Sequence, residues 1–158
     1  MILEVYRLHS SRYPANSGRG AALHGARWNA PGVEAIYTAQ SRSLAALEVL
    51  VHYAVLPRNF VLTSIRIPED RVSVMRLKPD ALFAGWAARN PENAAGLTQA
   101  QRMGSRWLSS MAVIGVPSAI IPEERIYVLN PAHPEFQYIE FSTSEPFRFD
   151  PRLKQPAV

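Results

Sequence analysis

The spacing of apolar and polar positions predicts a chain of short strands interrupted by two main helices. One helix is predicted over residues 42–55, where Ser41 supplies the N-cap. The other is predicted over residues 99–113, where Thr98 and Gln101 form a capping box. Seven segments have the alternation or the composition of strands: 2–8, 34–39, 60–67, 72–77, 118–121, 126–129 and 136–141.

This order of elements predicts an α+β fold, a single compact domain with mixed, mostly antiparallel sheets and a few helices. Residues 9–33, rich in Gly, Ser, Asn, Pro and Arg, are expected to form a long loop, and residues 80–88 a short helix. A chain of 158 residues fits one domain and is long enough to bury its own core.

Cysteine, histidine and long apolar runs are scarce in this chain. It has no cysteine and four scattered histidines, so no disulfide framework and no metal site are expected. No apolar run approaches the roughly 20 residues of a membrane span. Glu4 stands where a signal peptide has basic residues. We therefore expect a soluble, cytoplasmic protein without a membrane partner.

Arginine dominates the positive charge. The net charge is +4, and fifteen of the seventeen basic residues are arginine. Residues 1–79 hold 10 basic and 5 acidic residues, against 7 and 8 in residues 80–158. An arginine-rich, positive half favours phosphate ligands, although a GC-rich genome explains the same bias. Because no segment clusters basic residues, direct binding of nucleic acid is not expected.

Three residues in the positive half offer the chemistry of a dinucleotide site. Arg27, in a loop with glycines, supplies a guanidinium fork for phosphate, and Tyr37, in a predicted strand, supplies a flat ring. Glu48 lies at the border of the apolar face of the first helix, where a carboxylate is partly shielded from water. Each residue also has a structural interpretation, as a surface arginine, a core tyrosine and a solvated glutamate. Ser118, a further candidate, also has a structural interpretation as a turn-forming serine.

Six short motifs, in this order, resemble the RES domain, the toxin half of RES–Xre toxin–antitoxin pairs. They are Tyr6-Arg7, Gly25-Ala-Arg27-Trp28, Ile36-Tyr37-Thr-Ala, Leu47-Glu48-Val-Leu-Val-His52, Val116-Pro117-Ser118-Ala and Leu129-Asn130-Pro-Ala-His133-Pro134. The resemblance covers about residues 2–136 and implies a fold similar to that of ADP-ribosyltransferases, with an NAD cleft. It predicts a RES domain over residues 1–150, followed by a C-terminal tail over 151–158.

The resemblance implies a role for each candidate residue. Arg7 and Arg27 match the arginines of the family's NAD site and would clamp the pyrophosphate. Tyr37 matches its tyrosine and would pack against nicotinamide or ribose. Glu48 matches its essential acid, which would stabilise the breaking bond, and Ser118 its late serine, which would hydrogen-bond the nicotinamide ribose or amide.

RES toxins consume NAD by hydrolysis or phosphorolysis, so the resemblance implies cleavage of the nicotinamide–ribose bond. One branch of the family ADP-ribosylates a nucleotide-synthesis enzyme, which makes transfer to a protein acceptor the alternative. The implied partner is an Xre-type DNA-binding antitoxin that blocks the cleft, with a toxin homodimer inside that complex. A non-enzymatic basic binding module is a third interpretation.

Two segments depart from the family pattern. Ile126 stands where the family often has asparagine, and Arg125 is the candidate replacement. Residues 78–104 are longer and more polar than in compact members, as expected of a lid or a partner surface. In the turn over residues 130–134, Asn130 and His133 are expected to fix the local backbone.

Overall fold

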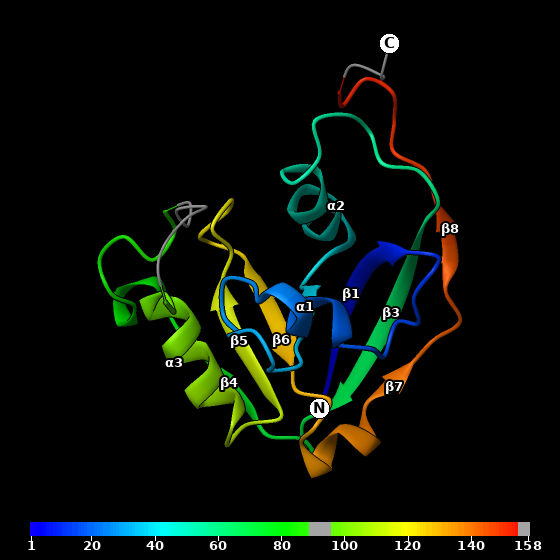
Figure 1. Ribbon diagram of the computed structural model, residues 1–158. Helices are drawn as coiled ribbons and strands as arrows, with labels where there is room; N and C mark the ends of the chain where they lie inside the picture. The colour runs from blue at the N-terminus through cyan, green and yellow to red at the C-terminus, as the bar shows by residue number, and fades with distance from the viewer. Residues whose placement is uncertain (89–95, 155–158) are drawn as a thin grey trace.

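One mixed sheet of eight strands forms the centre of the computed structural model, which describes residues 1–88 and 96–154 (Figure 1). The strands are β1 (Ile2–Ser10), β2 (Ile36–Ala39), β3 (Phe60–Pro68), β4 (Val74–Arg76), β5 (Val113–Pro117), β6 (Arg125–Leu129), β7 (Glu140–Phe141) and β8 (Glu145–Phe147). The helices are α1 (Arg19–His24), α2 (Arg42–Leu50) and α3 (Gln99–Leu108), with two 3₁₀-helices, η1 (Pro79–Ala81) and η2 (Pro134–Tyr138).

The strands follow the order β4-β5-β6-β2-β1-β3-β7, and β8 also pairs with β3. Among the residues described, β4 and β5 form the one parallel pair, and the other pairs are antiparallel. The predicted α+β fold, with a mixed, mostly antiparallel sheet and a few helices, is confirmed.

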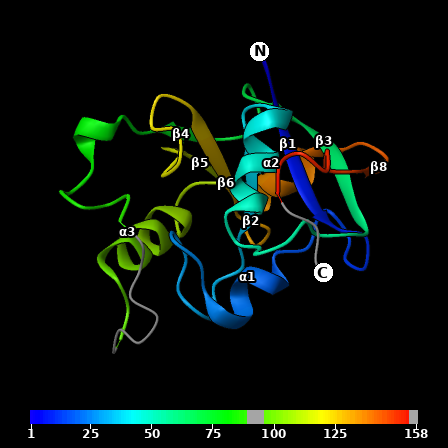
Figure 2. The ribbon, with the colours of Figure 1, turned by 90° about the horizontal axis from the view of Figure 1, so that it is seen from above.

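The sheet is weakly joined between β1 and β2. These strands meet at one residue pair, Tyr6 opposite Ala39, whereas β1 pairs with β3 along its whole length from Ile2 to Ser10. The sheet therefore opens beyond that pair, and α2 packs against both β1 and β2 at the opening. Figure 2 shows α2 lying over this junction, and Figure 1 shows the two halves of the sheet on either side of it.

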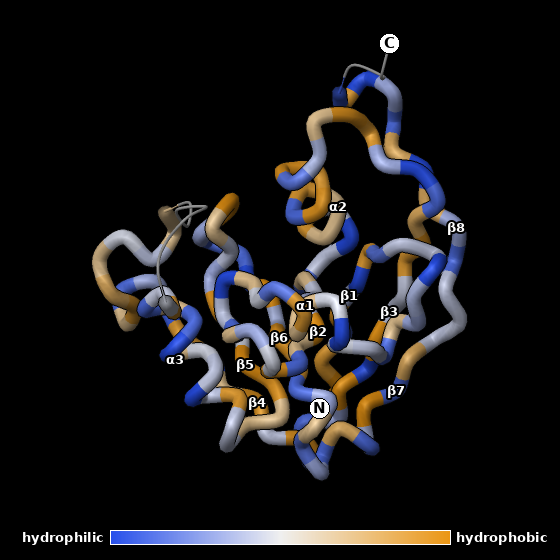
Figure 3. Tube along the Cα trace, in the orientation of Figure 1, coloured by the Kyte–Doolittle hydropathy of each residue, from blue (hydrophilic) through white to orange (hydrophobic). Residues whose placement is uncertain are grey.

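Apolar side chains cover both faces of the sheet. Successive residues of one strand point to opposite faces, so Ile114 joins one core cluster and Val113 the other. The first cluster includes Trp28 together with residues of α2 and α3. The second packs under η2. Figure 3 shows the apolar positions, in orange, along β4 and β5. Burial on both faces explains why β5, all of whose residues are buried, is a continuous apolar run.

Both main helices end earlier than predicted. α2 ends at Leu50 rather than at residue 55, and α3 ends at Leu108 rather than at residue 113. Residue 113 instead begins β5, a strand over residues 113–117 that the pattern did not predict, and all five of its residues are buried. A short, continuous apolar run does not distinguish a strand from a buried helix segment, which is why periodicity extended α3 too far.

Other segments also differ from the prediction. Residues 118–121 form a turn rather than a strand, because the Ser118 hydroxyl accepts the amides of residues 120 and 121. The helix predicted over 80–88 is limited to η1, followed by turns. The long loop predicted over 9–33 contains α1. The last predicted strand splits into η2 and the short β7.

The C-terminal segment returns to α2. The Lys154 ammonium donates to the carbonyl of Leu50 at 2.5 Å and also to that of Tyr53. Figure 1 shows the last described residues, in red, on the side of α2 and away from the N-terminus. The predicted tail over 151–158 lies partly outside the described residues. Within residues 1–88 and 96–154, no helix has the length and apolarity needed to cross a membrane.

Gly104 of α3 lies directly on the backbone of the buried Trp28. A Cβ at this position would stand 1.9 Å from the Trp28 carbonyl oxygen. We expect Gly104→Ala to lower the free energy of unfolding by about 3 kcal/mol, because the helix and the loop would have to separate. Urea unfolding measures this change. The matched control is Gly20→Ala in α1, where nothing lies within 4 Å of the added Cβ. Equal stabilities of the two variants would contradict the close packing.

Candidate functional site

A cavity of about 960 Å³ lies where β1 and β2 separate beneath α2. Three of the five predicted site residues, Arg27, Tyr37 and Glu48, line it, although they come from a loop, a strand and a helix. Further polar and aromatic lining residues were not assigned to the site from the sequence: Tyr6, His24, His52, Tyr53 and Gln101. Cavities that bind small molecules have volumes of roughly 300–1,000 Å³ and a few convergent polar groups, so this one can hold a large ligand.

Glu48 is half-buried in the cavity wall. Leu44, Ala45 and Leu50 anchor α2 in the core, which turns the Glu48 face of the helix toward the cavity. The Ser41 hydroxyl caps the helix by accepting the amide of Leu44 at 3.1 Å, as predicted. Glu48 therefore sits on a rigid element, at the border position that helix periodicity indicated.

Ser118 holds the Glu48 carboxylate. The Ser118 hydroxyl donates to Glu48 Oε1 at 2.7 Å and accepts the amides of Ile120 at 3.0 Å and Ile121 at 3.1 Å. The serine is fully buried and is not among the lining residues. Since its proton is directed at Glu48, its hydroxyl orients the carboxylate rather than reaching into the cavity.

Tyr37 links strand β2 to the loop that carries Arg27. Its hydroxyl donates to Asn29 Oδ1 at 2.7 Å and accepts the amide of Trp28 at 3.0 Å. Burial raises the pKa of Tyr37 well above its usual value, so the phenol stays neutral at physiological pH. The hydroxyl is thus engaged by protein groups, while the side chain lines the cavity.

Asn29 completes this link, and it was not among the site residues predicted from the sequence. It is fully buried, and its Nδ2 donates to the carbonyls of Ala21 at 3.0 Å and Val33 at 2.9 Å. One side chain therefore ties together the end of α1, the following turn and Tyr37. A polar residue directly after a buried tryptophan was the available signal for this role.

Arg27 lines the cavity from the loop that follows α1. Its Nη1 donates to the carbonyls of Trp86 at 2.8 Å and Ala88 at 2.9 Å. Desolvation lowers the pKa of Arg27, while the charge of Glu48 and the nearby Tyr37 raise it. The guanidinium remains a cation, so the cavity holds a fixed positive group and a carboxylate that attract each other.

Arg7 takes a different position from the one predicted. Tyr6 and Leu8 line the cavity, so Arg7 between them points to the other face of β1. Its Nη1 donates to the carbonyls of Ala15 and Ser17, the latter at 3.0 Å, and desolvation lowers its pKa to about 10. Arg7 thus holds the segment that leads into α1 and does not line the cavity with Arg27.

Two further expectations concern β6. Ile126 lines the cavity, so an apolar side chain occupies the place where the resemblance led us to expect an asparagine. Arg125 does not replace that asparagine. It lines a separate, smaller hollow with Pro117 and Pro122, and its backbone amide bonds Gln40 Oε1 at 2.8 Å. The cavity is therefore more apolar at this wall than the family pattern implied.

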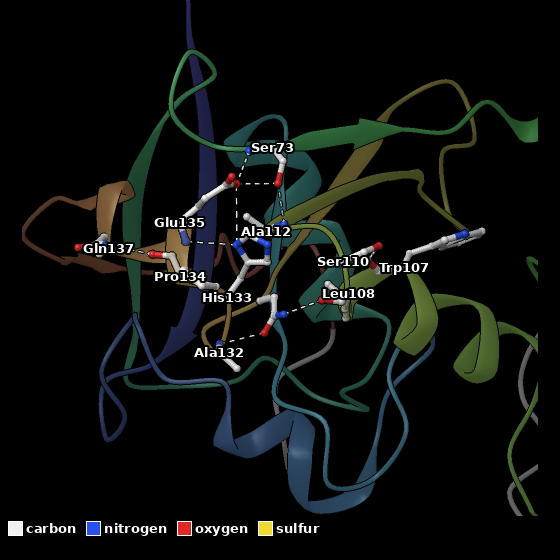
Figure 4. Close-up of polar contacts among 11 residues, drawn as sticks. Ser73, Trp107, Leu108, Ser110, Ala112, Ala132, His133, Pro134, Glu135 and Gln137 are labelled. Atoms are coloured by element: carbon white, nitrogen blue, oxygen red, sulfur yellow. Dashed lines mark hydrogen bonds and ion pairs between the residues drawn. The ribbon is translucent and has the colours of Figure 1, made fainter.

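The turn after β6 has a structural role, as predicted (Figure 4). Asn130 Nδ2 donates to the Leu108 carbonyl at 2.6 Å, and His133 Nδ1 accepts the Glu135 amide at 3.2 Å. The Glu135 carboxylate accepts the amide and the hydroxyl of Ser73, both at 2.7 Å. These bonds join α3, β4 and η2, and none of these side chains lines the cavity.

Comparison with known proteins identifies the family of the chain. The family model of the RES domain matches residues 4–150, a range that contains all the cavity-lining residues named above. The chain belongs to the RES domain family. The match includes the segments that carry Arg27, Tyr37 and Glu48.

Relatives within the RES family are toxins. The chain is 41% identical over 156 residues to "Toxin Res" of Photorhabdus laumondii, which covers 94% of this chain and 96% of that protein. It is 37% identical over 146 residues to the "Prs ADP-ribosylating toxin" of a Sphingobium species, covering 89% and 88%. In structure it is similar to a chain of the M. tuberculosis MbcT–MbcA toxin–antitoxin complex, with a TM-score of 0.69, 22% identity and coverage of 93% and 85%.

Proposed function

We propose that this RES domain is the toxin of a toxin–antitoxin pair and that it binds NAD in the α2 cavity and cleaves the nicotinamide–ribose bond. The observation that carries the proposal is that Arg27, Tyr37 and Glu48 line one cavity, where the charge of Glu48 raises the pKa of Arg27. A cationic fork, an aromatic ring and a carboxylate are the groups that a pyrophosphate, a nicotinamide and a ribose require.

The residues present fit NAD. Arg27 would contact the pyrophosphate, because guanidinium and phosphate form charge-assisted hydrogen bonds. The side chain of Tyr37 would pack against the nicotinamide end, since its hydroxyl is already bonded to Asn29 and Trp28. Arg7 would act indirectly by holding residues 15–17, in place of the direct contact expected from the sequence.

Glu48 would supply the negative charge that the reaction needs. When the glycosidic bond breaks, its electron pair moves to the pyridinium nitrogen, so nicotinamide leaves as a neutral molecule and the ribose becomes oxocarbenium-like. A fixed carboxylate beside the ribose stabilises that cation and orients the incoming oxygen. Attack by water then gives ADP-ribose and releases one proton. Attack by phosphate at the same carbon gives ADP-ribose 1″-phosphate.

Ser118 would act through Glu48. Replacing Ser118 by alanine removes the hydroxyl that fixes Glu48 Oε1. We expect kcat for NAD cleavage to fall about tenfold, the effect of losing one hydrogen bond to a charged group, with KM nearly unchanged. Steady-state nicotinamide release measures both constants. Ser142→Ala, which removes a hydroxyl bonded to Ser64 on β3, is the control. A rise in KM with unchanged kcat would instead indicate a direct substrate contact.

Transfer of ADP-ribose to a protein is the second candidate reaction. The name of the Sphingobium relative, an ADP-ribosylating toxin, is the observation that favours it. NAD labelled in its adenine ring separates the candidates when it is incubated with the protein and a cell lysate. Label in free ADP-ribose or its phosphate supports cleavage, and a labelled protein band supports transfer.

An Xre-type antitoxin is the proposed partner, because the similar solved chain comes from a toxin–antitoxin complex. Expression of the chain with and without a candidate antitoxin tests this partner in cells. We expect cellular NAD to fall only without the antitoxin. Equal NAD in both cultures, at equal levels of the protein, would contradict the pair.

A further inference from the structure

The turn from Phe83 to Ala88 touches Arg27, yet the proposed reaction gives it no role. The backbone carbonyls of Trp86 and Ala88 in this turn accept hydrogen bonds from Nη1 of Arg27 at 2.8 and 2.9 Å. The turn is closed by its own bonds, from the Trp86 amide to Phe83 at 3.2 Å and from the Ala88 amide to Gly85 at 3.0 Å. Gly85 has φ +82°, a conformation that favours glycine.

The side chain of Trp86 docks this turn on the protein. Its ring lies 6.4 Å from that of Trp28, and the Trp28 ring lies 5.8 Å from that of Trp107 on α3, measured between centroids. These are the three tryptophans of the chain. Trp28 is fully buried and follows Arg27 directly in the sequence, so the cluster of three tryptophans adjoins the arginine. Packing of the rings therefore places the two carbonyls where Arg27 can reach them.

We propose that the turn Phe83–Ala88 is a positioning element that holds Arg27 in its substrate-binding orientation. The identity of the substrate rests on the proposed function. An arginine side chain has about 2 kcal/mol of rotamer entropy, which is lost before substrate arrives if protein groups already hold the guanidinium. Both bonds use Nη1, so among residues 1–88 and 96–154 the guanidinium has Nε and Nη2 to offer to a phosphate.

Gly85→Ala tests the role of the turn in binding. Nothing lies within 4 Å of an added Cβ, so the variant introduces backbone strain without a clash. We expect KM for NAD to rise about tenfold, as for one weakened hydrogen bond to a charged group, with kcat changed by less than about twofold. Gly96→Ala is the matched control, because Gly96 has φ +78° and the same open space. Trp86→Ala should reproduce the rise in KM by undocking the turn.

Amide hydrogen exchange tests the coupling without any substrate. Arg27→Gln should speed exchange at the amides of Trp86 and Ala88, whereas Arg12→Gln, at an exposed position, should not. Faster exchange supports the inference even if the protein leaves NAD intact, an outcome that refutes the proposed reaction alone. Unchanged exchange in Arg27→Gln overturns the inference, as does a wild-type KM in both Gly85→Ala and Trp86→Ala.

Discussion

Glu48→Gln is expected to reduce the rate of nicotinamide release by about 10³-fold, because the variant loses the negative charge that faces the developing ribose cation. Glutamine keeps the size of the side chain, and its amide oxygen can still accept the Ser118 hydroxyl. The dissociation constant for NAD, measured by calorimetry, should therefore change by less than about threefold. Loss in kcat with retained binding distinguishes stabilisation of the transition state from binding of the substrate.

A matched control for Glu48→Gln is Glu123→Gln, which neutralises an exposed carboxylate that lines the smaller hollow instead of the cavity. This control corrects for the change in net charge. Nicotinamide release at the wild-type rate by Glu48→Gln would remove Glu48 from the reaction, even if the RES fold still bound NAD.

Arg27→Ala should lower kcat/KM for NAD by about 100-fold, mainly through KM, since hydrogen bonds to a charged group contribute roughly 1.5–3 kcal/mol. Steady-state kinetics over a wide range of NAD concentrations measures the effect. The variant also loses the two bonds to the turn at Trp86 and Ala88. Unfolding by urea should change little, because these partly exposed carbonyls can bond to water instead.

Arg27→Lys separates charge from geometry at this position. Lysine keeps the positive charge but lacks the planar fork that bonds two carbonyls and a phosphate together. We expect it to recover only a small part of the lost kcat/KM. Full recovery by lysine would show that Arg27 acts as a simple charge. It would contradict a role in which several guanidinium nitrogens contact the carbonyls and the phosphate.

Local chemistry allowed part of the site to be predicted from the sequence. Arg27, Tyr37 and Glu48 lie within 22 residues of one another, and a loop, a strand and a helix in succession bring them to one cavity. Helix periodicity placed Glu48 at the border of an apolar face, and this position faces the cavity. The capping box of α3 was likewise predicted, because capping depends on residues close in sequence.

Features that depend on contacts between residues far apart in the sequence could not be predicted in this way. Arg7 lies on a strand with buried residues on both faces, so alternation does not tell which face meets the cavity. The bond from Ser118 to Glu48 joins residues 70 positions apart. The contact of Arg27 with Trp86 depends on how a turn docks, which no periodic pattern encodes. The single pairing of β1 with β2, which opens the cavity, is a property of strand register.

Release of nicotinamide from NAD by the purified protein tests the central proposal most directly. The wild-type chain and Glu48→Gln, matched in concentration and in unfolding midpoint, are incubated with NAD, and free nicotinamide is separated by chromatography. We predict steady release by the wild type, with and without added phosphate as the acceptor, and almost none by Glu48→Gln. Intact NAD in every wild-type reaction, including one with cell lysate as a source of acceptor protein, would contradict the proposal.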